Sequence, residues 1–177
     1  MRALNNFRIY QEAATKKRFA LLEYLSAMRK ESNFQRVQEL INQGSEINTV
    51  GNLGDSPLHM AVITNNEKIV KLLLDKGAKV NVKNLLGFTP ISLAVSISNI
   101  NIAKLLLEKG ANVNERNSPF GNSLLHDSVS LNKIEMVKLL ISKGASVNAK
   151  NDMGFTPFDL AKTENMKTLL LVKGAKR

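Results

Sequence analysis

The chain lacks cysteine and tryptophan, and it has only two tyrosines among its 177 residues. Without cysteine it can form no disulfide, no thiolate metal site and no cysteine nucleophile. No apolar run approaches the roughly 18 residues that suggest a membrane-spanning helix, and the N-terminus lacks the apolar core of a secretory signal. These absences favour a soluble protein of a reducing compartment, so we expect a cytoplasmic or intracellular location.

The sequence also lacks the short motifs that carry catalysis. It contains no G-x-x-x-x-G-K-[ST] phosphate loop, no H-E-x-x-H zinc motif and no G-x-S-x-G nucleophile motif. Positive charge, by contrast, is in excess, because 25 Lys and Arg residues stand against 15 Asp and Glu residues and give a net charge of +10. Such an excess is a physical reason to consider anionic partners, but it carries no information about the fold.

Glycines recur at a fixed period, which is the main organising feature of the sequence. A first series has separations of 33, 33, 34 and 30 residues, and a second series has separations of 33, 34 and 33. The series consist of Gly44, Gly77, Gly110, Gly144 and Gly174, and of Gly54, Gly87, Gly121 and Gly154. A period in this range indicates stacked structural units, with a turn-forming segment between the paired glycines.

Each unit is predicted to contain two short helices. The first opens at a hydroxyl residue, as in Ser56-Pro57, Thr89-Pro90, Ser123-Leu124 and Thr156-Pro157. A hydroxyl N-cap bonds free backbone N–H groups, and a following proline presets φ. The second helix carries apolar residues at i, i+3 and i+4, for example Val70, Leu73 and Leu74. Each unit therefore has an apolar face that it cannot bury alone.

In these features the chain resembles the ankyrin-repeat family. Ser56-Pro57-Leu58-His59-Met60-Ala61 is similar to the family's T-P-L-H-x-A helix opening, and residues 70–81 and 137–148 match the second half of its repeat. The resemblance implies an all-α solenoid of stacked helix-turn-helix units joined by β-turn or hairpin loops. The repeats are expected at about residues 21–53, 54–86, 87–120, 121–153 and 154–177, after a basic N-terminal extension, residues 1–20, that we expect to be helical.

Departures from the family pattern predict local differences. Ser92 and Asp159 stand where the family has histidine, and the last unit is three residues short. We expect this last unit to be distorted or to act as a cap. In the first unit, Arg36 and Glu39 replace apolar residues of the later units. We expect them to form the polar outer face that terminal repeats of a solenoid need for solubility.

The two histidines, His59 and His126, occupy the same place in units two apart. Because packed helices lie roughly 8–10 Å apart, the two rings should be about 20 Å apart and cannot share a metal ion. We expect each imidazole to bond backbone groups and to tie neighbouring repeats together. Asp127 does not form a catalytic pair with His126, since adjacent residues of a helix do not face each other. The sequence predicts no enzyme, no catalytic residue, no cofactor and no metal site.

The resemblance implies that the loop tips and the concave helix face bind a protein partner. The expected partner-binding residues are Leu53, Asp55, Ile63, Leu85, Leu86, Phe88, Ile97, Phe120, Asn122, Leu131, Met153 and Phe155. Many are large and apolar, and a contiguous exposed apolar patch often marks an interaction site. In the competing interpretation, residues such as Leu86 and Phe88 fold back to cover the next repeat. We expect the chain alone to be monomeric.

A second hypothesis rests on lysines that recur with the same period. Two expected columns consist of Lys71, Lys104 and Lys138, and of Lys76, Lys109 and Lys143. Such columns suit nucleic acid or an anionic membrane surface, although they can also simply keep the helix backs soluble. The scarcity of aromatic residues weakens the nucleic-acid alternative, because bases stack on aromatic side chains.

The composition also resembles one group within the family. Small asparagine- and lysine-rich ankyrin proteins occur in intracellular bacteria and in some large DNA viruses, where many act on host proteins. This resemblance keeps export into a host cell open as a hypothesis.

Overall fold

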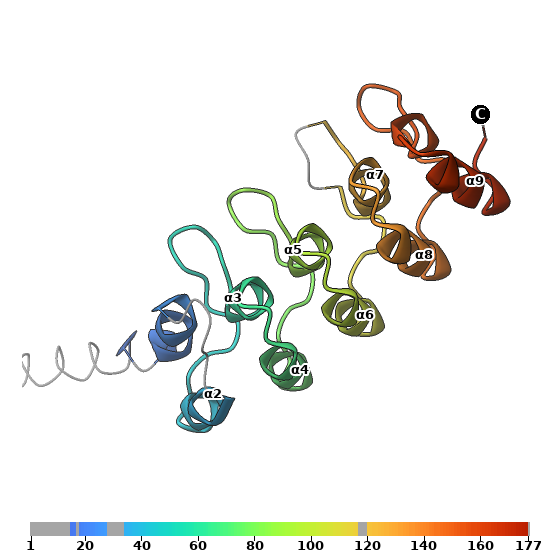
Figure 1. Ribbon diagram of the computed structural model, residues 1–177. Helices are drawn as coiled ribbons and strands as arrows, with labels where there is room; N and C mark the ends of the chain where they lie inside the picture. The colour runs from blue at the N-terminus through green and yellow to red at the C-terminus, as the bar shows by residue number, and fades with distance from the viewer. Residues whose placement is uncertain (1–14, 17, 28–33, 117–119, 177) are drawn as a thin grey trace, which may run out of the picture.

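The protein is an array of short helices in two rows (Figure 1). The computed structural model describes residues 15–16, 18–27, 34–116 and 120–176. The labelled elements are α2 (Phe34–Asn42), α3 (Pro57–Ile63), α4 (Glu67–Asp75), α5 (Pro90–Ser96), α6 (Ile100–Glu108), α7 (Leu124–Ser130), α8 (Ile134–Ser142), the 3-10 helix η1 (Phe158–Leu160) and α9 (Glu164–Val172). Another helix, over residues 18–27, precedes α2. Each unit contributes one helix to the first row, which includes α3, α5 and α7, and one to the second row, which includes α4, α6 and α8.

The first helices of the three central units begin at the predicted hydroxyl residues. Ser56, Thr89 and Ser123 each accept a hydrogen bond from the backbone N–H three residues later. The helices that follow, α3, α5 and α7, are only seven residues long. Isolated helices of this length are unstable in water, so their stability must come from packing against their neighbours.

The core lies between the two rows and runs through all the units. In one unit, Leu58, Ile69 and Leu73 are at most 1% exposed. The equivalent residues of the next two units are just as buried: Ile91, Ile102, Leu106, Leu125, Met136 and Leu140. Because α3 packs on both α4 and α5, and α4 also packs on α6, each unit buries its apolar face against the next one.

The last unit departs from the others, as its shorter sequence predicted. In place of a seven-residue α-helix it has η1, a single 3-10 turn. The expectation of an α-helix after Thr156-Pro157 was therefore wrong, because three missing residues remove almost a full helical turn. A local cap is retained, since the Asp159 carboxylate accepts hydrogen bonds from the Thr156 N–H at 2.7 Å and from its hydroxyl at 2.8 Å.

Charged side chains occupy the two ends of the stack. In the second helix of each unit after the first, the residue equivalent to Ile69 is buried. The first unit has Arg36 at this position, and Arg36 is exposed and pairs with Glu39 at 3.0 Å. The next position, Val70, is buried in the central units, whereas the last unit has Lys167 there. The polar face expected for the first unit is confirmed, and the last unit has a matching one.

The N-terminal helix crosses the boundary expected at residues 20 and 21, because it continues over residues 18–27. Leu21 and Leu25 of this helix are fully buried in the core, and Arg18 pairs with Glu46 at 2.9 Å. Residues 18–20 therefore extend the first helix of the first unit. Most of the predicted helical extension, residues 1–14 and 17, lies outside the described residues.

Candidate functional site

The loops that precede the first helices project from the stack as tips, visible above the first row in Figure 1. The tips contain the second glycine series, Gly54, Gly87, Gly121 and Gly154, with φ between 65° and 83°. Glycine adopts positive φ without the steric cost that a side chain would add. The left-handed backbone conformation of each tip therefore explains why a glycine recurs there.

A buried asparagine organises two of the tips. The Asn84 Oδ1 atom accepts hydrogen bonds from the Leu86 N–H at 3.1 Å and the Phe88 N–H at 2.9 Å. Its Nδ2 atom donates to Asp55 Oδ1, in the preceding tip, at 2.8 Å. Asn151 makes the equivalent bonds: its Oδ1 atom accepts from the Met153 and Phe155 N–H groups, and its Nδ2 atom donates to Asn122 Oδ1. Each asparagine thus shapes its own tip and joins it to the one before.

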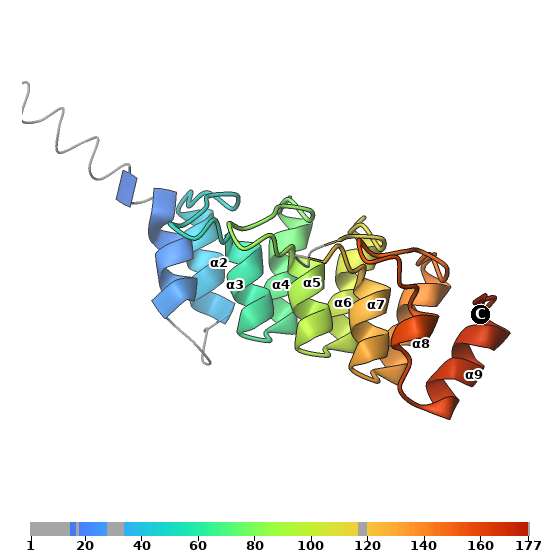
Figure 2. The same cartoon turned by 90° about the horizontal axis from the view of Figure 1, so that it is seen from above.

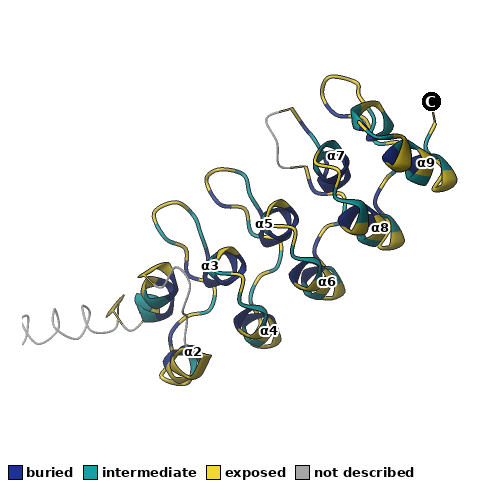
Figure 3. Ribbon diagram, viewed as in Figure 1, coloured by how far each residue is buried: buried dark blue, intermediate teal, exposed yellow. Residues whose placement is uncertain are grey.

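One apolar residue from each tip contributes to a line along the stack. The residue just before each tip glycine is apolar and more than half exposed: Leu53 (61%), Leu86 (68%), Phe120 (56%) and Met153 (56%). We call these four residues the tip stripe, and Figure 3 shows how the tips stand out as exposed segments. The Leu85 N–H donates to the Leu53 carbonyl at 2.9 Å, and the Asp152 N–H to the Phe120 carbonyl at 2.9 Å. These backbone bonds hold neighbouring members of the stripe in register.

A second group of exposed apolar residues lies at the other end of the first helices. Ile63, Ile97 and Leu131 are 47%, 43% and 59% exposed and lie where α3, α5 and α7 end. We call them the helix-end group. In Figure 2 the tips lie along one edge of the molecule and the turns that follow the first helices along the opposite edge. The predicted surface therefore has two apolar borders, one at each end of these seven-residue helices.

The other predicted partner-binding residues differ in their environments. Leu85 and Phe155 are exposed beside the tip stripe, at 75% and 45%. Phe88 is half-buried, which agrees with the competing interpretation for this residue, whereas the 68% exposure of Leu86 contradicts it. Asp55 and Asn122 are half-buried and bond the organising asparagines, so they also have a structural role.

The histidines make the ties that the sequence predicted. The Nδ1 atom of His59 accepts a hydrogen bond from the Ser56 N–H at 3.1 Å, which leaves Nε2 to donate to the Phe88 carbonyl of the next tip at 3.0 Å. His126 repeats the arrangement with Ser123 and the Phe155 carbonyl. Both rings are at most 1% exposed. A neutral imidazole fits these bonds, because one nitrogen accepts and the other donates.

This arrangement predicts a loss of stability in mild acid. Burial lowers the pKa of both His59 and His126 from 6.5. As the pH falls below 6.5, the unfolded chain therefore binds more protons than the folded protein. The free energy of unfolding is highest above this pH, and each histidine lowers it by up to about 1.4 kcal/mol per pH unit below it. We expect the free energy of unfolding, measured with urea, to fall between pH 7 and pH 5.5. A double His59→Ser, His126→Ser variant should lose this slope, and an equal slope in both proteins would contradict the assignment.

A second asparagine series, whose role the sequence interpretation missed, ties the repeats at their other end. Asn48 donates from Nδ2 to the Gly77 carbonyl at 3.2 Å and accepts at Oδ1 from the Lys79 N–H at 2.8 Å. Asn81, Asn114 and Asn148 make the same pair of bonds to the next unit. These asparagines recur with the period of the glycines. That shared period was the available signal, because an amide side chain can donate from its nitrogen and accept at its oxygen at the same time.

The lysines of the second hypothesis lie among carboxylates. Lys109 pairs with Asp75 at 2.8 Å, and Lys138 pairs with Glu135 at 2.8 Å. Lys76, Lys109 and Lys143 are the residues that cap the C-terminal ends of α4, α6 and α8. A cation there is favoured by the helix dipole, which gives this column a structural reason independent of any ligand.

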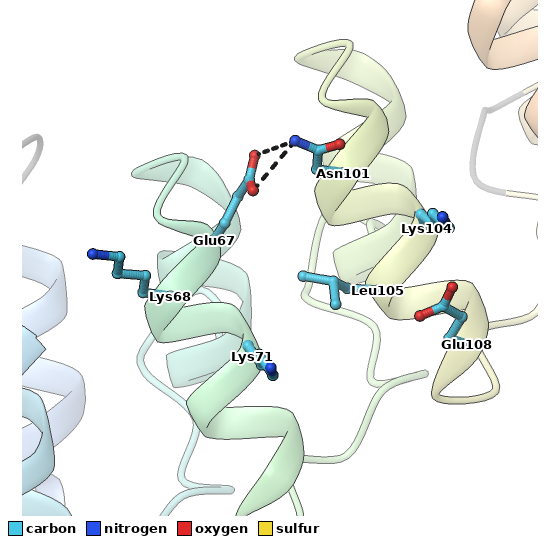
Figure 4. Close-up of a pocket in the computed structure, with 7 residues that line it drawn as sticks. All are labelled: Glu67, Lys68, Lys71, Asn101, Lys104, Leu105 and Glu108. Carbon is cyan, nitrogen blue, oxygen red and sulfur yellow. Dashed lines mark hydrogen bonds between the residues drawn. The ribbon is translucent and has the colours of Figure 1, made fainter.

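Lys71 and Lys104 share a groove of about 400 Å³ between α4 and α6. Figure 4 shows Leu105 between the two helices and the Glu67 carboxylate bonded to Asn101 at one end. Since Glu67 and Glu108 line the same groove as the lysines, charges of both signs share this surface. The positive field over it is therefore weaker than the lysine column alone would produce.

Within the part of the chain that the structure describes, no three His, Asp or Glu side chains gather where they could hold a metal ion. None of the helices in that part is long and apolar enough to cross a membrane.

Two profiles of known protein families match the chain. The family profile described as ankyrin repeats (3 copies) matches residues 24–117, and the single ankyrin-repeat profile matches residues 120–152. The chain belongs to the ankyrin-repeat family. Ankyrin repeats are in general non-catalytic protein–protein interaction modules. No curated protein matches the chain by sequence.

The ankyrin matches end at residue 152, so the distorted last unit lies beyond them. Its α9 nevertheless carries Met166 and Leu170 at 0% exposure, in the positions that Met136 and Leu140 have in α8. This unit continues the stack by burying the same columns with a shortened first helix.

Proposed function

We propose that this ankyrin-repeat protein is a non-catalytic module that binds a protein partner across its loop tips and the exposed face of its first helices. The observation that carries the proposal is the tip stripe. Its four members are each more than half exposed, yet they are large and apolar and come from four successive tips. A soluble protein gains nothing for its own stability from such a line of exposed apolar side chains, whereas a partner can bury it.

The construction of the tips supports the same proposal. Backbone bonds from Leu85 to Leu53 and from Asp152 to Phe120 fix neighbouring tips relative to each other. Asn84 and Asn151 fix the shape of individual tips with bonds to two N–H groups each. A preorganised surface loses little conformational entropy on binding, so more of the interaction free energy appears as affinity.

We expect replacement of Leu53, Leu86 and Met153 by serine to weaken partner binding at least about 100-fold, because a few buried apolar anchors carry most of the affinity of an interface. The partner is first captured from cell lysate with the tagged chain, at low and high salt and after nuclease treatment. Its dissociation constant is then measured for the wild type and the variant. Since the three side chains are already exposed, the circular dichroism spectrum and the urea midpoint should change little.

A matched variant with Lys71, Lys104 and Lys138 replaced by alanine tests the polyanion alternative in the same experiment. The proposed module retains its partner in this variant, at high salt and after nuclease. Loss of binding in the lysine variant, together with unchanged binding in the serine variant, would show that the second-row helices bind the ligand and would refute the proposal. Binding to nucleic acid or to an anionic membrane would also fall steeply with salt.

A further inference from the structure

One charged side chain lies in the middle of the proposed binding face. The fourth residue of each first helix is Met60 in α3, Leu93 in α5 and Asp127 in α7. All three are half-buried, and in α7 the residues around Asp127, from Leu124 to His126 and from Ser128 to Val129, are buried. Asp127 thus replaces an apolar residue on the one face of α7 that remains accessible.

The position of Asp127 connects the two apolar borders of the surface. Its Oδ1 atom accepts a hydrogen bond at 3.0 Å from Asn122 Nδ2, at the base of the tip that contains Phe120. Ser130 and Leu131 follow Asp127 at i+3 and i+4, so they lie on the same side of the helix. A segment that runs along α7 from Phe120 of the tip stripe to Leu131 of the helix-end group therefore passes this carboxylate.

No cation within the described part of the protein neutralises Asp127. The ion pairs among those residues leave it out. The ammonium of Lys133 interacts with it only at longer range, because the Lys133 Nζ atom donates to the Val95 and Ser96 carbonyls at 2.8 and 2.9 Å. Burial raises the pKa of Asp127, which means that its ionised form is less well solvated than in water. A cation that approached its free side would restore the lost interaction.

We propose that Asp127 is the specificity-determining anchor for a basic side chain of the partner, and that the surface fits a peptide segment with an arginine or lysine between apolar residues. This inference rests on the proposed function, because it names the chemistry of the segment that crosses the same surface. The apolar residues pack on the tip stripe and the helix-end group, and the basic residue pairs with the Asp127 carboxylate between them. Charge complementarity selects the partner here, although the protein as a whole has a net charge of +10.

The test uses random 12-residue peptides displayed on phage and selected on the immobilised full chain. Selected peptides are synthesised, and their dissociation constants are measured with the wild type, with Asp127→Asn and with Glu135→Gln. Asparagine keeps the shape of the side chain and an oxygen for the Asn122 bond but removes the charge. Glu135 is a matched control, since it is exposed on α8 and loses the same charge in an isosteric change.

We expect the selected peptides to carry arginine or lysine flanked by apolar residues. Their binding should weaken about 10-fold or more in Asp127→Asn and less than about 2-fold in Glu135→Gln, in line with a charge-assisted hydrogen bond. Peptides that lose affinity for the Leu53, Leu86 and Met153 serine variant but bind Asp127→Asn as tightly as the wild type would refute the role of Asp127 and leave the proposed function standing. Selection that yields no peptide sensitive to the serine variant would contradict both proposals.

Discussion

Replacing His59 by alanine is expected to lower the free energy of unfolding by about 3–4 kcal/mol. The imidazole is fully buried and bonds groups in two different units, the Ser56 N–H and the Phe88 carbonyl. Alanine would leave both groups without these bonds, at about 1–3 kcal/mol each, and would leave a cavity between the units. Urea denaturation at pH 7.5, where the histidine is neutral in both states, measures the effect.

The next unit supplies a natural control. Ser92 occupies the equivalent position, and its hydroxyl accepts a hydrogen bond from the Thr89 N–H at 2.9 Å but donates locally, to the Thr89 carbonyl at 2.8 Å. Replacement of Ser92 by alanine therefore removes the local cap, at about 1–2 kcal/mol, without an interaction between units. If His59→Ala and Ser92→Ala lowered the free energy of unfolding equally, the hydrogen bond from His59 to the Phe88 carbonyl would contribute nothing measurable to stability.

The second large effect is expected from Gly54→Ala, which should lower the free energy of unfolding by about 2–5 kcal/mol. Gly54 has φ of 75°, and an added Cβ would lie 2.9 Å from the Leu85 nitrogen and 3.1 Å from the Asn84 Cα. Both contacts are with the backbone of the next tip, which cannot rotate away as a flexible side chain can. The strain should therefore separate the first two tips, and we expect the affinity for the partner to fall as well.

Gly87→Ala separates backbone strain from the steric clash. Gly87 has φ of 81°, close to that of Gly54, but its added Cβ would meet nothing within 4 Å. Only the cost of the left-handed conformation remains, about 1–2 kcal/mol. The urea midpoint of Gly54→Ala should thus lie clearly below that of Gly87→Ala. Equal midpoints would mean that neighbouring tips are not packed as closely as the contacts between Gly54 and residues 84 and 85 require.

Backbone conformation also explains why asparagine stands in two of the three turns between paired helices. Asn65, Ser98 and Asn132 have φ between 54° and 61°. Asparagine tolerates this left-handed conformation better than most residues that have a side chain. Serine at residue 98 has no such preference, and nothing in the structure explains its presence there.

The sequence by itself determined the architecture, because a solenoid is built from local signals repeated at a fixed period. The glycine series, the hydroxyl caps and the i, i+3, i+4 apolar positions each specify a local conformation, and a unit with one apolar face can bury it only against its neighbours. The same reasoning anticipated the histidine ties, the polar face at Arg36 and the irregular last unit. These features depend on a residue and its nearest neighbours along the chain or one period away.

Only the tertiary structure decided the environment of each surface residue. The sequence grouped Leu86, Phe88 and Asp55 together, yet Leu86 is exposed, Phe88 is half-buried and Asp55 bonds Asn84. It also gave no reason to single out Asp127 as a binding residue. Two features of the packed stack point to Asp127: no described cation forms an ion pair with it, and exposed apolar residues of neighbouring units lie on the same surface. Burial and charge compensation at a position are set by atoms that come from other repeats, so they follow from the packed stack and not from the order of residues within one unit.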